Sequence, residues 1–161
     1  CLARAAGQGR VLPGPEACLA LSGAPKSRQL VFASLGRIRK IDLDGGMPQL
    51  IAKVGAGLGG LTWNGAGDIV YANVQIQSGA RLMRLSETGG APTEFLRPDA
   101  TLKQTSVGLP SFLPDGRHFL YTASSSSDTR TIFVASLDGG APIAVVDAAS
   151  MAQYVAPGFV L

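Results

Sequence analysis

The sequence is poor in the residues that build metal sites and nucleophilic centres. Its 161 residues include one histidine, His118, and two cysteines, Cys1 and Cys18. Two thiols can form neither a disulfide framework nor a thiolate zinc site, and one imidazole excludes a site built from paired histidines. A single Cys1–Cys18 bridge is an alternative, but we interpret both residues as unpaired thiols. We therefore predict no metal and no cofactor.

Charged residues are also scarce, at 16% of the chain, whereas hydrophobic residues make up 46%. This balance argues against a disordered chain, and the length suits one domain with a sizeable core. No apolar run approaches the ~18 residues that a membrane span requires. The 21 glycines and 10 prolines predict many turns and short strands instead of long helices.

Positive charge is concentrated at the start of the chain. Residues 1–40 carry seven basic and one acidic side chain, and the remaining residues carry seven basic and ten acidic side chains. One interpretation is contact with an anionic surface, and the other is a solvated segment. We favour the solvated segment because no aromatic residues are interleaved with the charges, and we predict no nucleic-acid partner.

Residues 111–142 alternate turn chemistry with runs of β-branched and aromatic residues. Pro114, Asp115 and Gly116 suit a tight turn, because proline fixes φ, aspartate hydrogen-bonds the nearby backbone and glycine accepts positive φ. A second turn begins at Asp138. The runs beside both turns are typical of half-buried strands, so this stretch predicts four consecutive strands.

The same order of strands and turns occurs three times. A Gly-Gly-x-Pro element lies at 45–48, 89–92 and 139–142, with spacings of 44 and 50 residues. Four strands per repeat of this length are typical of a β-propeller blade. We predict an all-β fold, a partial β-propeller of about three four-stranded antiparallel blades plus the start of a fourth. The expected segments are an irregular stretch or blade remnant at 1–15, blades at about 16–52, 59–96 and 107–146, and the next blade from 151–161.

Two copies of the repeat align closely. Trp63 occupies the place of Phe112, and Tyr71 that of Tyr121. The later copy is one residue longer after the turn glycine, which a bulge or a wider turn can absorb. We predict that Trp63 and Phe112 wedge between adjacent blades.

The repeat resembles a known family. Phe112–Arg117, followed by Leu137–Gly140, is similar to the repeats of TolB-like (WD-like) bacterial β-propellers, and the resemblance covers about residues 29–161. The second copy departs from the pattern, with Asn64–Gly67 where Ser-Pro-Asp-Gly is expected. Members of this family occur in periplasmic scaffold proteins, in extracytoplasmic parts of bacterial serine/threonine kinases, and as lids of prolyl-oligopeptidase-like enzymes. The resemblance alone does not choose among these settings.

Three blades do not close a ring, because propellers usually have about 4–8 blades. We expect the chain to be part of a larger bacterial protein that supplies the remaining blades. Self-association through the open blade faces is the alternative. On this view Cys1 results from an arbitrary cut and is not the lipidated first residue of a lipoprotein.

No catalytic motif is visible. The chain has neither a Gly-x-Ser-x-Gly elbow nor a P-loop, and we interpret Gly55–Gly60 as a crossing between blades instead of a dinucleotide site. His118 follows a turn and is interpreted as a surface residue. Asp44, Asp115 and Asp138 lie in turns, where Asx hydrogen bonding explains them. We predict that this chain is not an enzyme.

One rim of the propeller is the predicted binding surface. It collects the loops between the second and third strands of each blade, together with the crossings between blades, which include 97–105 and 124–128. Long loops on a rigid scaffold often carry recognition. The candidate residues are Arg97, Asp99, Lys103, Gln104, Ser125 and Asp128. We expect the partner to be a protein or a small ligand.

These observations predict a non-catalytic β-propeller segment that serves as a protein- or ligand-binding scaffold in the periplasm or another extracytoplasmic compartment. One alternative is the sensor propeller of a bacterial serine/threonine protein kinase, and another is the propeller domain of a prolyl-oligopeptidase-like serine peptidase. His-Arg-Asp and Asp-Phe-Gly motifs upstream would favour the kinase. A Gly-x-Ser-x-Gly motif downstream would favour the peptidase.

Overall fold

The computed structural model describes residues 28–55, 57–76, 78–126 and 129–147 with their side chains. Five further strands are described by their backbone alone. They are β1 (Leu2–Ala5), β2 (Gln8–Val11), β3 (Ala20–Gly23), β15 (Gln153–Val155) and β16 (Gly158–Val160).

Three four-stranded sheets make up most of the molecule, and each is an antiparallel meander in chain order. The first sheet joins β3 to β4 (Gln29–Ser34), β5 (Arg37–Asp42) and β6 (Gln49–Lys53). The second contains β7 (Leu58–Trp63), β8 (Asp68–Gln75), β9 (Gly79–Ser86) and β10 (Thr93–Leu96). The third contains β11 (Gln104–Phe112), β12 (His118–Ser125), β13 (Arg130–Ser136) and β14 (Ile143–Asp147). A 3₁₀ turn, η1 (Ala100–Leu102), lies in the crossing from β10 to β11.

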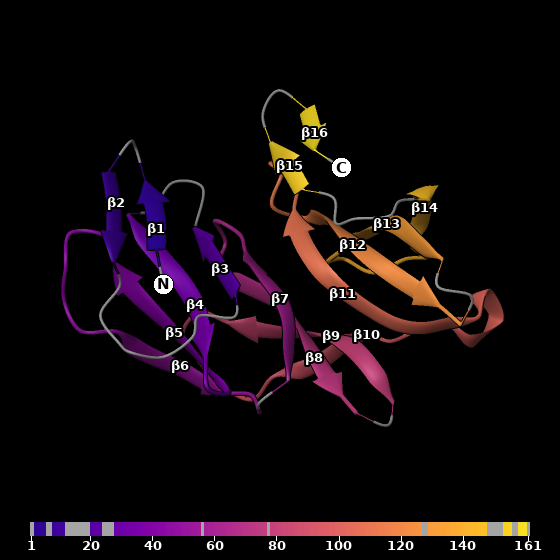
Figure 1. Ribbon diagram of the computed structural model, residues 1–161, viewed down its shortest axis with the longest axis horizontal. Helices are drawn as coiled ribbons and strands as arrows, with labels where there is room; N and C mark the ends of the chain where they lie inside the picture. The colour runs from indigo at the N-terminus through magenta and orange to yellow at the C-terminus, as the bar shows by residue number, and fades with distance from the viewer. Residues whose placement is uncertain are drawn as a thin grey trace.

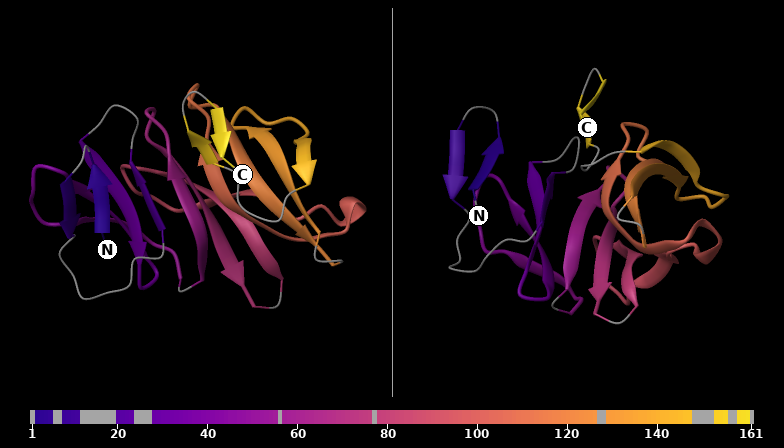
Figure 2. Two further views of the ribbon diagram at one scale, coloured as in Figure 1. Left: turned by 45° about the horizontal axis from the view of Figure 1, so that its top comes forward. Right: turned by 45° about the vertical axis from the view of Figure 1, so that its right-hand side comes forward.

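The sheets lie side by side like the blades of a fan (Figures 1 and 2). Strand β7 packs against β3 and β4, and β11 packs against β7, β8 and β9. The first strand of each later blade therefore contacts the preceding blade, as in a propeller. The prediction of an all-β, partial β-propeller with four-stranded antiparallel blades is confirmed.

Residues 1–15 contain a hairpin where the sequence predicted irregular structure or the remnant of an earlier blade. Strands β1 and β2 pair antiparallel, from Leu2 opposite Val11 to Ala5 opposite Gln8. The expectation of irregular structure followed from the lack of a side-chain period and from the glycines and prolines. A two-stranded ladder is held by backbone groups, so it forms without such a period.

Successive residues of β8 pack against two different neighbours. Ile69 and Tyr71 belong to a core cluster shared with the first blade, and Val70 and Ala72 belong to a cluster shared with the third. All four residues are at most 1% exposed. Because side chains alternate along a strand, a blade between two others must be apolar on both faces. This explains the unbroken apolar run at the start of β8.

Two aromatic residues fill the boundaries between blades. Trp63, which is 3% exposed, lies in the cluster between the first and second blades. Phe112 packs against the cluster between the second and third blades, with its ring 5.8 Å from that of Phe119. The predicted wedge positions of Trp63 and Phe112 are confirmed.

Gly59 and Gly60 lie inside β7, whereas the sequence placed them in a crossing between blades. The pairing of β7 with β8 shifts between Leu58 and Leu61, and Gly60 has a φ of 115°. A Cβ at Gly60 would lie only 3.1 Å from the Cα of Leu109 on β11. The glycines therefore allow a close approach of the innermost strands instead of marking a loop.

The turn before β12 is wider than the turn before β8. Leu113 donates its backbone N–H to the carbonyl of His118 at 2.8 Å, whereas Asn64 donates to Asp68 at 3.0 Å. The first pair is five residues apart and the second is four. The additional residue is thus accommodated by a wider turn, which is one of the two alternatives, a bulge or a wider turn, that the sequence analysis gave.

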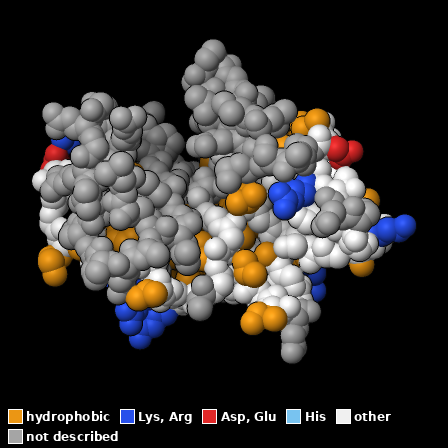
Figure 3. All heavy atoms as spheres, viewed as in Figure 1, with side chains coloured by type: hydrophobic (Ala, Val, Ile, Leu, Met, Phe, Trp, Pro, Cys, Tyr) orange, Lys and Arg blue, Asp and Glu red, His pale blue; other side chains and the backbone are white. Residues whose placement is uncertain are grey.

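The face of the molecule in Figure 3 shows apolar side chains in small separate groups. The most exposed large apolar residues are Ile76, Met47 and Ile143, which come from three different blades. Within the described residues, no helix has the length and hydropathy that a membrane crossing requires.

Candidate functional site

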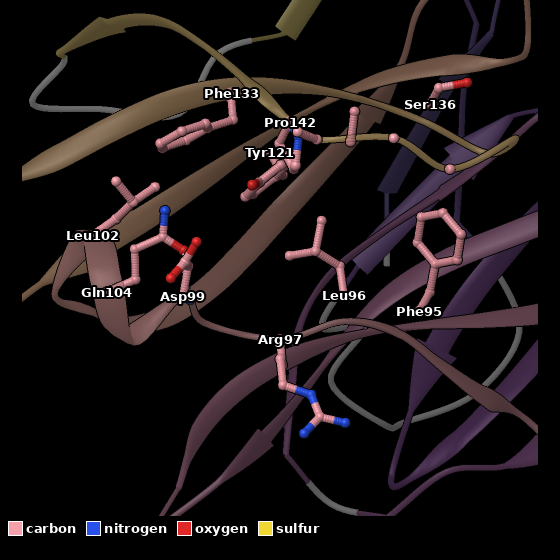
Figure 4. A pocket seen from close by; sticks show the side chains of 14 residues that line it. Phe95, Leu96, Arg97, Asp99, Leu102, Gln104, Tyr121, Phe133, Ser136 and Pro142 are labelled. Carbon is pink, nitrogen blue, oxygen red and sulfur yellow. Dashed lines mark hydrogen bonds between the residues drawn. The ribbon is translucent and has the colours of Figure 1, made fainter.

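A groove of about 460 Å³ lies between the outer strand of the second blade and the middle strands of the third (Figure 4). One wall is formed by the end of β10, the crossing that follows it and η1. The opposite wall is formed by β12, β13 and the turn at 139–142. The volume falls within the ~300–1,000 Å³ typical of ligand pockets.

Aromatic rings form the floor of the groove. Tyr121 and Phe133 lie opposite each other in the β12–β13 ladder, so their rings share one face of the sheet. The two rings stack with centroids 5.4 Å apart and an angle of 17° between their planes. Phe95, at the bulge of β10, packs against Phe119 at 5.9 Å. This floor is fixed by strand pairing and core packing, so it is formed before any ligand binds.

The polar end of the groove is organised by Asp99, which caps η1. Its Oδ1 accepts hydrogen bonds from the backbone N–H of Thr101 at 2.8 Å and from the Thr101 hydroxyl at 2.6 Å. These bonds lower the pKa of Asp99, so its carboxylate is charged at neutral pH. The backbone N–H of Asp99 donates to Gln104 Oε1, and the backbone N–H of Gln104 donates to the Asp99 carbonyl, both at 3.0 Å. This pairing fixes the side chain of Gln104 next to Asp99.

The hydroxyl of Tyr121 faces this polar end. Figure 4 shows its oxygen on the side of the groove where Asp99 and Gln104 lie. Burial, together with the nearby charge of Asp99, raises the pKa of Tyr121 to about 12. Among the described residues, none forms a hydrogen bond with this hydroxyl. The groove therefore contains a neutral phenol with unused hydrogen-bonding capacity.

Arg97 lines the groove but turns its guanidinium away from Asp99 (Figure 4). Arg97 Nη2 lies 2.7 Å from Glu94 Oε1, and Arg81 Nη1 donates to Glu94 Oε2 at 2.8 Å. The hydrogen bond from Arg81, followed by the charge of Arg97, lowers the pKa of Glu94. The positive charge of Arg97 is thus held against the surface of the second blade.

The structure brings together four of the six residues predicted for the binding rim. Asp99, Lys103 and Gln104 surround η1, and Gln104 lies opposite Ser125 in the β11–β12 ladder. Lys103 has a φ of 55° and follows the last residue of η1. Ser125 ends β12, so it belongs to a strand and not to the loop at 124–128 expected from the sequence.

The other two predicted residues differ in position. Arg97 lies two residues before Asp99 in sequence but pairs with Glu94, and Asp128 lies outside the described residues. The sequence analysis did not single out Tyr121 or Phe133 as binding residues. It identified aromatic residues in strands as core, and the groove depends on where the chain crosses between blades, which no local pattern specifies.

The turn before β12 carries the histidine and a carboxylate. Asp115 Oδ1 accepts hydrogen bonds from the backbone N–H groups of Arg117 at 2.9 Å and His118 at 3.0 Å, as Asx bonding predicts. His118 Nδ1 lies 2.5 Å from Asp115 Oδ2, and 46% of the His118 side chain is exposed. Desolvation raises the pKa of Asp115, but the bonds from His118 and Arg117 outweigh it and bring the pKa to about 2. No group of three or more His, Cys, Asp or Glu in the described part of the chain could hold a metal.

Asx bonding does not explain the other two turn aspartates. Asp44 pairs with Arg28, and the backbone N–H of Asp44 donates to Asp42 Oδ1 at 2.9 Å. Asp138 accepts from Arg117 Nε at 3.0 Å. The expectation for Asp44 and Asp138 is therefore wrong, because a cation within reach forms a charge-assisted bond that competes with the local backbone bond.

Comparisons with known proteins identify the fold of this chain. No family model and no curated protein matches the chain. A protein assigned as TolB from Agrobacterium tumefaciens matches with a TM-score of 0.69 and 17% identity over 90% of this chain and 52% of that protein. TolB from Acinetobacter baumannii matches with a TM-score of 0.72 and 15% identity over 94% of this chain and 38% of that protein. A chain of a nidogen/laminin complex matches with a TM-score of 0.69 and 13% identity over 87% of this chain and 52% of that chain.

These similarities show that the chain has the TolB-like β-propeller fold. The chain spans about half the length of the Agrobacterium tumefaciens protein and of the chain from the nidogen/laminin complex, and 38% of TolB from Acinetobacter baumannii.

Proposed function

We propose that this chain is a non-catalytic binding segment of a larger β-propeller protein, and that it recognises a partner protein or a ligand in the groove between the second and third blades. The groove is the observation that carries this proposal. It combines a fixed aromatic floor, formed by Tyr121 and Phe133, with convergent polar groups at Asp99 and Gln104. An apolar concave surface with a few placed polar groups is typical of binding sites.

The comparisons support this proposal at the level of fold. One similar structure is that of a nidogen/laminin complex, so a chain of this fold occurs in a complex between two proteins. We also propose an extracytoplasmic location, which follows from the resemblance of the repeat to TolB-like propellers. A kinase or peptidase domain attached to the propeller would lie outside residues 1–161, and the flanking coding sequence tests both alternatives.

Backbone amide chemical shifts of the 161-residue chain test the groove directly. The probe is a pool of capped pentapeptides Ala-Leu-Xaa-Leu-Ala in which Xaa is varied. We expect the shift changes to gather at Gln104, Ser136 and residues 139–140, which line the groove. Changes confined to the rim of tight turns, or no changes at millimolar peptide, would contradict the proposal.

Two exposed leucines provide a matched pair of variants. Leu102 lines the groove and is 55% exposed, whereas Leu50 lies on β6 of the first blade and is 52% exposed. Leu102→Ala removes an apolar wall of the groove and should weaken peptide binding by about three- to tenfold. Leu50→Ala removes the same side chain elsewhere and should leave binding unchanged.

A further inference from the structure

The charges that line the groove are one anion and one cation, and only the anion is directed into it. Among the described lining residues these are Asp99 and Arg97. Arg97 is paired with Glu94 at 2.7 Å and points away from the polar end. The carboxylate of Asp99 is fixed by two hydrogen bonds from Thr101 and keeps its charge. An occupant of the groove therefore meets a negative charge at the polar end.

The groups around Asp99 suit the end of a long basic side chain. The Tyr121 hydroxyl is unbonded among the described residues and lies on the same side of the groove as Asp99, so both oxygens can accept from an ammonium or guanidinium group. Leu102, which is 55% exposed, can cover the methylene stem that leads to this group, above the small exposed parts of Phe133 and Tyr121, which are 7% and 2% exposed. Aromatic rings near a cation add to its binding.

Gln104 provides a group for a second part of the occupant. Its Oε1 accepts from the backbone N–H of Asp99 at 3.0 Å, so its amide orientation is fixed. The Nε2 of Gln104 forms no hydrogen bond with another described residue and can donate to a carbonyl oxygen. A peptide residue with a basic side chain has both a cation and a main-chain carbonyl, whereas a simple amine has only the cation.

We propose that the groove binds the lysine or arginine side chain of an extended segment in a partner protein. The cation lies between Asp99 and the Tyr121 hydroxyl, and a main-chain carbonyl of the segment accepts from Gln104. This inference rests on the proposed function of the groove and adds to it the chemical class of the occupant.

Binding of four labelled peptides to the 161-residue chain tests the inference. The probes are capped Ala-Leu-Xaa-Leu-Ala with Xaa as arginine, lysine, Nε-acetyl-lysine or glutamate, measured by fluorescence polarisation at low salt. Acetyl-lysine keeps the length of lysine but removes the charge. We expect the arginine and lysine peptides to bind about tenfold more tightly than the other two. This preference should shrink as salt is raised, because the groove is open to solvent.

Two conservative variants connect the preference to the named groups. Asp99→Asn removes the charge but keeps a side chain that caps equally well, so η1 should persist. Tyr121→Phe removes the hydroxyl and keeps the buried ring. We expect Asp99→Asn to abolish the preference for lysine over acetyl-lysine, and Tyr121→Phe to reduce it about threefold. Asp44→Asn, at an exposed turn of the first blade, makes the same change in net charge and should have no effect.

The outcomes separate this inference from the proposed function. Equal binding of all four peptides with shift changes in the groove, or a preference for glutamate, would overturn the inference that the occupant is a basic side chain. The groove would then remain a binding site, as the proposed function states. A lysine preference that survives Asp99→Asn would also overturn it. Absence of binding, or shift changes elsewhere on the chain, would overturn both proposals.

Discussion

Asn64 donates a hydrogen bond of 2.7 Å from its Nδ2 to the backbone carbonyl of Gly116, which joins a turn of the second blade to a turn of the third. The side chain is buried, with 1% of the residue exposed. Its Oδ1 accepts from the backbone N–H groups of Ala66 at 3.0 Å and Asp68 at 2.8 Å. Asn64 therefore stabilises its own turn and the contact between blades at once.

Asn64→Ala should lower the free energy of unfolding by about 2–3 kcal/mol, because it removes a buried side chain and leaves the partly buried backbone groups of Ala66, Asp68 and Gly116 without this partner. Urea unfolding followed by circular dichroism measures this change. Asn73→Ala, at a half-buried position on β8, should cost less than about 0.5 kcal/mol. Equal losses for the two variants would show that the Asn64 hydrogen bonds contribute nothing beyond removal of a side chain.

The two-residue turn between β4 and β5 contains a leucine in an unfavourable conformation. Leu35 has a φ of 46° and Gly36 a φ of 69°, so both central residues have the positive φ of a type I′ hairpin turn. Leu35 is 63% exposed and has no core role that would offset this conformation. Leu35→Asn should raise the free energy of unfolding by about 0.5–1 kcal/mol, since asparagine adopts positive φ at a lower cost.

Leu50 provides the control for this substitution. It is 52% exposed and lies in an extended strand, β6. Leu50→Asn should leave stability unchanged or lower it slightly, because asparagine is disfavoured in strands. If thermal unfolding shows the same shift for both variants, the gain at Leu35 does not come from turn conformation.

Repetition made the fold predictable from the sequence. The alignment of Tyr71 with Tyr121 is reproduced in three dimensions, since each ring lies on the face of its blade that packs against the preceding blade. Trp63 and Phe112 likewise occupy equivalent boundaries. Strand periodicity and turn residues determine such positions locally, so three copies of one pattern reinforce each other.

The groove was less predictable, because it depends on contacts between repeats. The sequence indicated the loop around Asp99 and Gln104, where the chain leaves the strand pattern. It did not indicate that Tyr121, a strand residue with the pattern of core, borders the same space. It also did not reveal that Glu94 holds Arg97, because that pair depends on the side-chain conformations at the end of β10.

Gly79 begins β9 at a point where the third blade comes very close. It has a φ of 73°, and a Cβ there would lie 2.0 Å from the carbonyl oxygen of Thr105. Gly79→Ala should lower the free energy of unfolding by at least about 3 kcal/mol, from backbone strain and from separation of the blades. Trp63, which is the only tryptophan, reports the transition by its fluorescence.

Gly139→Ala separates these two contributions. Gly139 has a φ of 93°, but a Cβ there would have nothing within 4 Å. Strain alone should cost about 1–2 kcal/mol. The difference between the two variants then measures the close approach of Gly79 and Thr105, and equal losses would show that the blades adjust freely.

Asp115 makes the free energy of unfolding depend on pH in the acid range. Its folded pKa of about 2 lies below the ordinary value of 3.8, because the ionised form accepts hydrogen bonds from the backbone of His118, the His118 ring and the backbone of Arg117. A depressed folded pKa stabilises the fold above the unfolded pKa, and this contribution is lost as the pH falls from about 4 to 2. Since 47% of the side chain is exposed, solvent screening limits the contribution to about 1 kcal/mol.

Asp115→Asn should therefore reduce the loss of unfolding free energy, measured by urea unfolding, between pH 4 and 2. Asp44→Asn should leave this loss unchanged, because the fold provides no comparable set of backbone donors for Asp44. An unchanged pH profile in Asp115→Asn would show that other carboxylates account for the acid sensitivity.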